Sequence, residues 1–189
     1  MKKTLRQHII GRLGQEPAQL DYVLSHFGVL ETRKNEVLLE VNSICRHVYF
    51  VARGCLKVTA YDRNGDEATT DLIFEEEWRT AMRSFVNQQP SNERIVSVEP
   101  SQLLVISREG FQKLSKETPA FEQIYKNLLE LSYSRSIERV HTLMSMDALT
   151  RLRWLLERHP LIFTRLSNRL IASYLGLSEA TLSRLKAKL

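Results

Sequence analysis

The sequence is poor in the residues that build metal and disulfide sites. It has two cysteines, Cys45 and Cys55, among 189 residues, with no CxxC pair and no companion histidine at zinc spacing. A structural metal ion or an iron–sulfur cluster is therefore not expected. We expect both cysteines to be free, buried thiols in a reducing compartment.

Long apolar runs are also missing. Hydrophobic residues make up 43% of the chain, yet no run approaches the ~20 residues that a membrane span needs. The N-terminal stretch MKKTLRQHIIGRL begins basic but has no apolar segment typical of a secretory signal. We therefore expect a cytoplasmic protein with no membrane partner.

Signatures of catalysis are absent as well. The five histidines are scattered along the chain, at His8, His26, His47, His141 and His159. No serine stands in the glycine context of a nucleophile elbow, and no glycine-rich loop is present to hold a phosphate. These observations predict a protein that is not an enzyme.

Positive charge is concentrated at one end of the chain. The net charge is +5, but residues 151–189 carry +6 and residues 1–150 carry −1. A basic segment of this kind is typical of a protein that binds the phosphate backbone of nucleic acid. The alternative is an ordinary solvated helix face.

The same basic segment holds a pattern of two short helices in LSNRLIASYLGLSEATLSRLKAKL. We predict helices over Asn168 to Leu175 and Glu179 to about Ala187. Ala172 allows a close helix crossing, Gly176 suits the positive φ that ends the first helix, and Ser178 caps the second. The apolar positions expected to be buried are Ile171, Leu175, Leu177, Leu182 and Leu185. This spacing favours a DNA-binding helix-turn-helix, with a plain helical hairpin as the alternative.

In such a motif the N-terminal part of the second helix enters the major groove. The predicted base contacts are Glu179, Ala180, Ser183 and Arg184, with Arg184 suited to bidentate contact with guanine. The predicted phosphate contacts are Ser178, Thr181, Arg169, Lys186 and Lys188.

Before this segment the pattern changes from helix to strand and back. Residues 1 to about 30 look helical, with Leu20, Val23, Leu24 and Phe27 at helical spacing after Glu16-Pro17. Strands are expected over residues 35–41, 47–53, 55–62, 67–74, 94–98 and 102–107, with a tight hairpin at Asn64-Gly65. Closely spaced antiparallel strands predict an α+β fold with an N-terminal jelly-roll barrel.

A long helix follows the strands and is expected over residues 110–144. Its apolar positions Phe121, Ile124, Leu128 and Leu131 step by three and four, as in a coiled-coil seam. We predict a homodimer through this seam, with packing inside one chain as the alternative. Asp147 is expected to cap the next helix. The boundary therefore divides the chain into residues 1–144, the barrel with its dimerisation helix, and residues 145–189, the DNA-binding domain.

This order of elements resembles the Crp/Fnr superfamily of bacterial transcription regulators, and most of all its short Bacteroidetes-type members. The likeness rests on VYFVARGCLKVTAYDRNGDEATTDLIF, with Gly54 and Asn64-Gly65 at turns, on PSNERIVSVEPSQLLVIS and on IASYLGLSEATLSR. The resemblance implies a cyclic-nucleotide-binding-like domain and a homodimer that reads DNA with two-fold-related half-sites. RNA polymerase is a further candidate partner.

Two features depart from the family pattern. The resemblance implies a Gly-Glu pair for ribose and an Arg-Ser or Arg-Ala pair for phosphate, but Thr80-Ala81 and Ser91-Asn92 stand at those positions. Cyclic AMP is therefore not expected as a cofactor, and Glu75, Glu76 and Glu77 would repel it. Arg83 and Arg94, beside Ser91 and Asn92, form a degenerate effector pocket for an unknown effector, and a scaffold without ligand is the alternative.

The second departure concerns the β-hairpin wing that the resemblance implies after the recognition helix, because the sequence ends at Leu189 without one. We expect non-specific affinity to come from the helix-turn-helix and its basic surroundings. The predicted function is a DNA-binding transcription regulator that does not depend on cyclic AMP. The alternatives are a regulator with an unidentified effector and a sensory module that acts through a protein partner.

Overall fold

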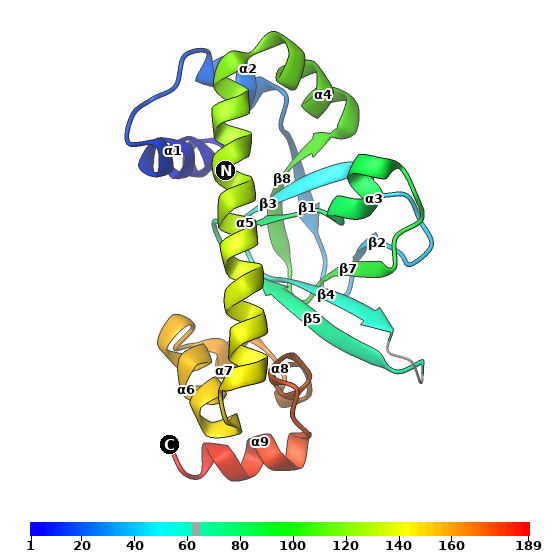
Figure 1. Ribbon diagram of the computed structural model, residues 1–189, viewed down its shortest axis with the longest axis vertical. Helices are drawn as coiled ribbons and strands as arrows, with labels where there is room; N and C mark the ends of the chain where they lie inside the picture. Colours follow the sequence, from blue (N-terminus) through cyan, green and yellow to red (C-terminus); the bar gives the residue numbers. More distant parts are fainter. Residues whose placement is uncertain (62–64) are drawn as a thin grey trace.

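The computed structural model describes residues 1–61 and 65–189. In sequence order its elements are α1 (Lys2–Leu13), α2 (Leu20–Ser25), β1 (Gly28–Thr32), β2 (Val37–Leu39), β3 (His47–Arg53), β4 (Leu56–Tyr61), β5 (Glu67–Ile73), β6 (Trp78–Arg79), α3 (Met82–Asn87), β7 (Glu93–Ser97), β8 (Ser101–Ser107), α4 (Arg108–Glu117), α5 (Pro119–Ser145), α6 (Ala148–Arg158), α7 (Ile162–Arg165), α8 (Asn168–Leu175) and α9 (Glu179–Lys186). Figure 1 shows the strands gathered beside α5, which runs the length of the molecule.

The described strands form two antiparallel four-stranded sheets. Their orders are β1-β8-β3-β6 and β2-β7-β4-β5. Between them lies an apolar core that includes Val51, Leu56, Val58, Ile95 and Leu103. The α+β class is confirmed, but the expected barrel is wrong in one respect, because the two sheets face each other as a sandwich and do not close.

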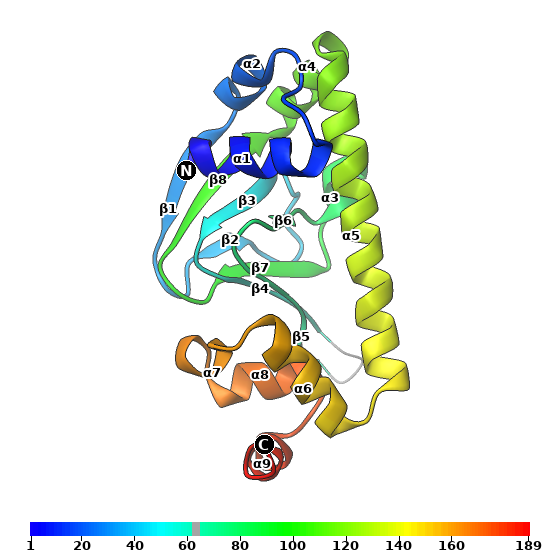
Figure 2. The ribbon, with the colours of Figure 1, turned by 90° about the vertical axis from the view of Figure 1, so that its left-hand side faces the viewer.

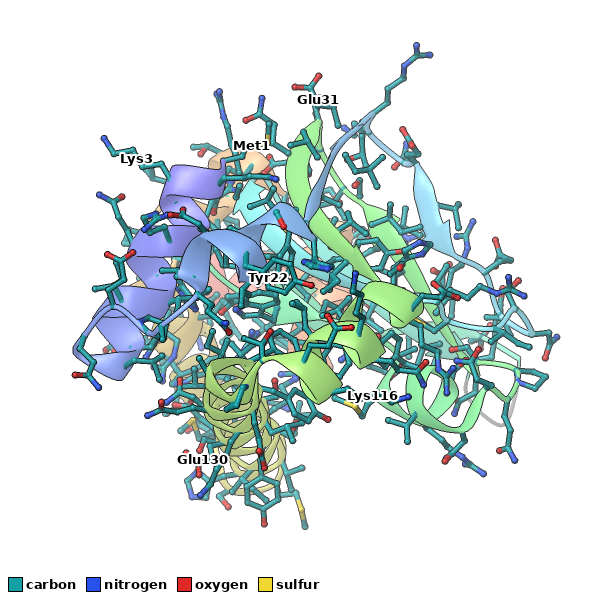
Figure 3. The ribbon with its side chains drawn as sticks, turned by 90° about the horizontal axis from the view of Figure 1, so that it is seen from above. Met1, Lys3, Tyr22, Glu31, Lys116 and Glu130 are labelled. Carbon is teal, nitrogen blue, oxygen red and sulfur yellow. The ribbon has the colours of Figure 1, made fainter. Side chains whose placement is uncertain are left out.

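Helices cover the outer face of the first sheet. Alternate residues of β3 and β8 point away from the sandwich core, and Phe50, Leu104 and Ile106 pack there against the helices. The covering side chains include Leu5 and Ile9 of α1. Figure 3 shows the molecule from above, with Tyr22 of α2 labelled. The Tyr22 hydroxyl donates to a Glu117 carboxylate oxygen at 2.9 Å.

The first thirty residues differ from the expected helical region. The chain leaves the helical conformation after α2, and Gly28 begins β1, which pairs with β8 from Gly28↔Val105 to Thr32↔Ser101. Strand β1 completes the edge of the first sheet and was missing from the prediction. The short elements β6, α3 and α7 were also missing.

Gly54 and Gly65, two glycines at predicted turns, both have a positive φ. Gly54 has φ 104°, and a Cβ at that position would lie 2.6 Å from Cβ of Ser101. In the predicted Asn64-Gly65 turn, Gly65 has φ 85° and Asn64 lies outside the described residues. Gly54 therefore has to be glycine for two reasons, its backbone angle and the close approach of β8.

The long helix expected over 110–144 is two helices. Residue Thr118 has φ −130° and ψ 95°, and Pro119 then begins α5, because proline disfavours the helical conformation in the residue before it. The predicted cap of the next helix is confirmed, since the Asp147 side chain accepts from the Thr150 backbone N–H at 2.8 Å. None of the described helices has the length and apolarity needed to cross a bilayer.

The C-terminal helices α6 to α9 pack beneath the second sheet. Figure 2 shows α6, α7 and α8 next to β4 and β5, with α9 on the far side. One apolar cluster spans this junction and joins Cys55, Leu72 and Phe74 of the sandwich region to Ile171 and Leu175 of α8. The C-terminal helices therefore share a core with the sandwich.

Candidate nucleic-acid interface

The two predicted helices of the basic segment are present. Helix α8 spans Asn168–Leu175 and helix α9 spans Glu179–Lys186. The predicted inward residues Ile171, Leu175 and Leu182 are fully buried, while Leu177 and Leu185 are partly buried against the same cluster. The burial pattern expected from sequence is therefore confirmed.

The turn between these helices is built from local hydrogen bonds. Gly176 has φ 67° and ψ 39°, the left-handed conformation that glycine adopts without strain. The N–H of Leu177 donates to the Ala172 carbonyl at 2.9 Å and that of Gly176 donates to the Ser173 carbonyl at 3.1 Å. This pair of bonds is the Schellman pattern, and it turns the chain sharply between α8 and α9.

Serine caps begin both helices. The Ser178 hydroxyl accepts from the Thr181 N–H at 3.1 Å, and Ser167 accepts from Leu170 in the same way at 3.2 Å. Each cap satisfies one free donor of a first turn. Ser178 was predicted, whereas the Ser167 cap was missed although a serine directly before a helical pattern is a readable signal.

The outward surface of α9 carries the residues predicted to contact bases. Glu179, Ala180, Ser183 and Arg184 are all exposed. Arg184 lies back along its own helix, with Nε donating to the Ala180 carbonyl at 3.4 Å and Nη2 to the Thr181 hydroxyl at 3.3 Å. Both are long bonds at the surface, so an acceptor on a partner can replace them at little cost.

The predicted phosphate contacts surround this surface. Ser178, Arg169, Lys186 and Lys188 are exposed and Thr181 is half-buried. The Lys186 ammonium donates to Oδ1 of Asn168 at 3.4 Å and lies 4.0 Å from the centre of the Phe163 ring. The end of α9 thus meets the start of α8, and Asn168 joins the polar surface although sequence reasoning did not single it out.

The C-terminal helices are also held to the sandwich by polar contacts. Arg165 of α7 pairs with both Glu75 and Glu99, and hydrogen bonds from these carboxylates raise the pKa of Arg165. Ser173 of α8 accepts from the Thr69 N–H and donates to its hydroxyl, each at 3.0 Å. These contacts set the position of α9 relative to the sandwich.

The degenerate effector pocket is only partly assembled. A cavity of about 170 Å³ between α3 and the start of β7 brings together Arg83, Ser91 and Asn92. Arg94 is elsewhere, because its Nε pairs with Glu40 at 3.0 Å. Ser91 is buried, and its hydroxyl both accepts from the Glu93 N–H and donates to the Glu93 carbonyl.

Arg79 is a further cation of this cavity. It lines the cavity, and its Nη2 pairs with a Glu93 oxygen at 2.6 Å. The expectation for Glu75, Glu76 and Glu77 is wrong, because none of them lines this cavity. Glu75 pairs with Arg165 and Glu77 with Arg135.

The predicted dimer seam on α5 needs correction. Phe121 and Ile124 are 3% exposed and pack against the protomer's own α1 and α2, and Leu128 packs against the same cluster. Leu131 is half-buried. A different apolar stripe is exposed further along α5, at Tyr133, Ile137, Val140 and Met144, with exposed fractions of 69%, 52%, 52% and 81%.

Comparisons with known proteins address the sandwich and the whole fold. Residues 29–118 match the family of cyclic nucleotide-binding domains. No curated protein matches the sequence.

Three solved structures illustrate the likeness. FixK2 from Bradyrhizobium japonicum has 16% identity and a TM-score of 0.69 over 86% of this chain and 84% of its own. The catabolite activator protein of Thermus thermophilus has 22% identity and a TM-score of 0.59 over 96% and 86%. A protein from Eubacterium rectale assigned to the Crp/Fnr family of transcriptional regulators has 16% identity and a TM-score of 0.69 over 90% and 82%. At these identities the likeness concerns the fold.

Proposed function

We propose that this protein is a homodimeric, sequence-specific DNA-binding regulator. The proposal starts from its match to cyclic nucleotide-binding domains and from the fold that it shares with Crp/Fnr transcription regulators. Residues 1–144 form its sandwich with the long helix, and residues 145–189 form its DNA-binding unit. The observation that carries the proposal is the outward surface of α9, where four exposed residues stand on a rigidly capped helix.

The chemistry of that surface suits the edges of base pairs. Arg184 offers two parallel donors to guanine O6 and N7, and Glu179 and Ser183 add secondary base contacts. Ala180 is small enough to let the helix approach the groove floor. Ser178, Thr181, Arg169, Lys186 and Lys188 then serve the phosphates on either side and position the helix.

The homodimer is proposed to form along the exposed stripe of α5. Tyr133, Ile137, Val140 and Met144 repeat at intervals of four, three and four residues, which is the spacing of a coiled-coil seam. Thr142, on the opposite side of α5, is buried. Two copies joined along this stripe would carry two α9 helices related by a two-fold axis, which suits paired half-sites.

The regulator is proposed to act without cyclic AMP. A cyclic phosphate needs a charge-assisted partner when it leaves water. In the cavity at α3, Arg79 is already paired with Glu93, and the Ser91 hydroxyl is engaged with the backbone of Glu93. The cavity of about 170 Å³ is also smaller than the 300–1,000 Å³ that is usual for a ligand pocket.

Binding to duplex DNA as a function of salt tests the function. The expected logarithmic slope is steeply negative, because each phosphate that is neutralised releases condensed counterion. Selection from a pool of randomised duplexes should then recover a site with two-fold symmetry. A flat salt dependence with no selected site would favour the alternative of a sensory module that acts through a protein partner.

Calorimetry tests the role of the nucleotide. Titration of the dimer with cyclic AMP and with cyclic GMP is expected to give no heat of binding, while the unliganded protein already binds the selected duplex. Micromolar binding of either nucleotide that also strengthens DNA binding would contradict this part of the proposal.

A further inference from the structure

A second cavity lies where the sandwich, α5 and the C-terminal helices meet. Its volume is about 340 Å³, and its walls come from β5, β6, β7, α5, α6 and α8. The volume falls within the usual range for small-molecule sites. Except for Arg79 and Glu93, its lining residues are distinct from those of the cavity at α3, so it is a separate space.

Four arginines line this cavity, and three of them have carboxylate partners. The pairs are Arg79 with Glu93, Arg135 with Glu77, and Arg158 with Glu138. Asp71 also lines the cavity, and it faces Arg135 at 3.5 Å and Arg79 at 4.0 Å. The walls thus carry four carboxylates and four arginines, and three of these arginines have ion-pair partners.

Arg139 is the exception. Among the described residues no carboxylate forms an ion pair with it. Its Nη2 donates to the Tyr174 carbonyl, and its guanidinium lies 3.8 Å from the centre of the Tyr174 ring. A backbone carbonyl and a ring face supply only partial negative charge, so Arg139 has no carboxylate in direct contact with it.

The remaining nitrogens of Arg139 strengthen this point. Nε and Nη1 are buried and have no hydrogen-bond acceptor, and Nε of Arg79 is in the same state. Buried donors without acceptors are uncommon, and a charged donor in this state is costly. Burial also lowers the pKa of Arg139, although the charge of Asp71 acts to raise it.

We propose that this cavity binds a small oxyanion, a carboxylate or a phosphate, with Arg139 as its main partner. A planar guanidinium pairs with either group through two parallel hydrogen bonds. Ser132 and Ser136 stand on the same face of α5, about two turns and one turn before Arg139, and both residues line the cavity. Together they complete a site of one cation and two neutral polar groups.

An anion at this place connects three parts of the molecule. It contacts α5 through Arg139, and the walls on either side are the sandwich strands and the helices that carry α9. Occupancy therefore stabilises the packing of the C-terminal helices on the sandwich. The site itself does not depend on DNA binding, so it stands or falls separately from the proposed function.

The chain contains its own reporters for this site. Both of its tryptophans, Trp78 and Trp154, line the cavity. The full chain is titrated with inorganic phosphate and, separately, with succinate, at an ionic strength held constant with potassium chloride. A saturable change in tryptophan fluorescence and a rise in melting temperature are expected with at least one of them. A response to phosphate but not to succinate identifies a phosphate site, and a response to succinate but not to phosphate identifies a carboxylate site. No saturable change with either anion, up to about 10 mM, would overturn the proposal.

Two variants and a control locate the binding. Arg139→Gln removes the cation, and the loss of its charge-assisted hydrogen bonds should weaken anion binding by about ten- to a hundredfold. Because this change also alters the contact with Tyr174, Ser136→Asp provides a second test at an exposed position. Its carboxylate lies one turn from Arg139, pairs with it, and should exclude the anion.

Arg153→Gln is the matched control. Arg153 is exposed on α6 beside Trp154 and does not line the cavity. Its replacement by glutamine changes the net charge by the same amount as Arg139→Gln. The control should bind the anion as the wild type does. If Arg153→Gln weakens binding as much as Arg139→Gln, or if Ser136→Asp has no effect, the anion does not sit at Arg139 and the proposal fails.

Discussion

Arg165 of α7 and Glu75, two residues after β5, form a bidentate ion pair. Nη2 lies 2.8 Å from Oε1 and Nη1 lies 3.1 Å from Oε2. Glu75 also accepts from the Gly54 N–H at 2.9 Å. Although burial acts to raise the pKa of Glu75, these hydrogen bonds lower it on balance. The pair fastens the C-terminal helices to a fixed turn of the sandwich.

Arg165→Gln is expected to reduce the free energy of unfolding by about 1–2 kcal/mol. Arg165 is half-buried, and its removal leaves both Glu75 and Glu99 without this partner. The expected loss of unfolding free energy is therefore larger than for an isolated surface ion pair. Urea unfolding measures the change. Arg153→Gln, at an exposed site on the preceding helix α6, is the control and should be nearly neutral. Equal stability of Arg165→Gln and wild type would show that the pair contributes nothing.

The stability of the protein should fall with pH between about 6.5 and 4 partly because of His159. Burial, followed by the charges of Arg135, Arg165 and Arg158, lowers the pKa of His159 from 6.5 to about 4. The unfolded chain therefore takes up a proton first as pH falls, and protonation favours unfolding. Stability from the neutral ring is complete above pH 6.5 and is lost as pH falls toward 4.

His159→Phe separates this effect from the titration of carboxylates. The His159 ring stacks on Phe74 with centroids 3.8 Å apart, and phenylalanine preserves an aromatic contact without a titrating group. Unfolding free energies measured from pH 7 to pH 4 should fall less steeply in the variant. Parallel curves for wild type and variant would contradict the assignment.

Ile137→Glu is expected to convert the proposed dimer to a folded monomer. The substitution places a charge in the middle of the exposed stripe, where a partner helix would bury it without a counter-charge. Sedimentation velocity measures the change, and circular dichroism checks that the fold is kept. Ser134→Glu, at an exposed position about a quarter turn away, should remain a dimer. A dimer that survives Ile137→Glu would place the interface away from this stripe.

Arg184→Ala should weaken binding to the selected duplex more than binding to random duplex. A bidentate guanine contact discriminates by about 1–3 kcal/mol, whereas a phosphate contact weakens all sequences alike. Lys188→Ala serves as the phosphate control and should reduce both affinities together while lowering the salt slope. Equal losses for Arg184→Ala on both duplexes would make Arg184 a phosphate contact.

The elements that sequence predicts well are those with local signals. The bounds of α8 and the start of α9 follow from residues within a few positions of each end, namely the glycine at 176 and the serine at 178. The helical and strand periods of longer elements are equally local. The two residues of β6 and the six of α3 are too few to show a period, and both elements were missed.

Contacts between residues that are distant in sequence could not be predicted from such local signals. The pattern of Phe121 and Ile124 is the same whether the covering surface belongs to the same chain or to a second one. Likewise the three glutamates at 75–77 read as one negative cluster, although successive side chains turn to different neighbours. Glu75 finds Arg165, which is 90 positions away, and no local rule connects them.

The straight run of α5 makes it a lever. At 1.5 Å per residue its 27 residues span about 40 Å, so a tilt of one degree at the sandwich end moves the other end by about 0.7 Å. Hydrogen bonds to base edges tolerate only a few tenths of an ångström before they weaken. A tilt too small to disturb the packing of the sandwich is thus amplified along α5 to the scale on which the proposed contacts between α9 and base edges would form or break.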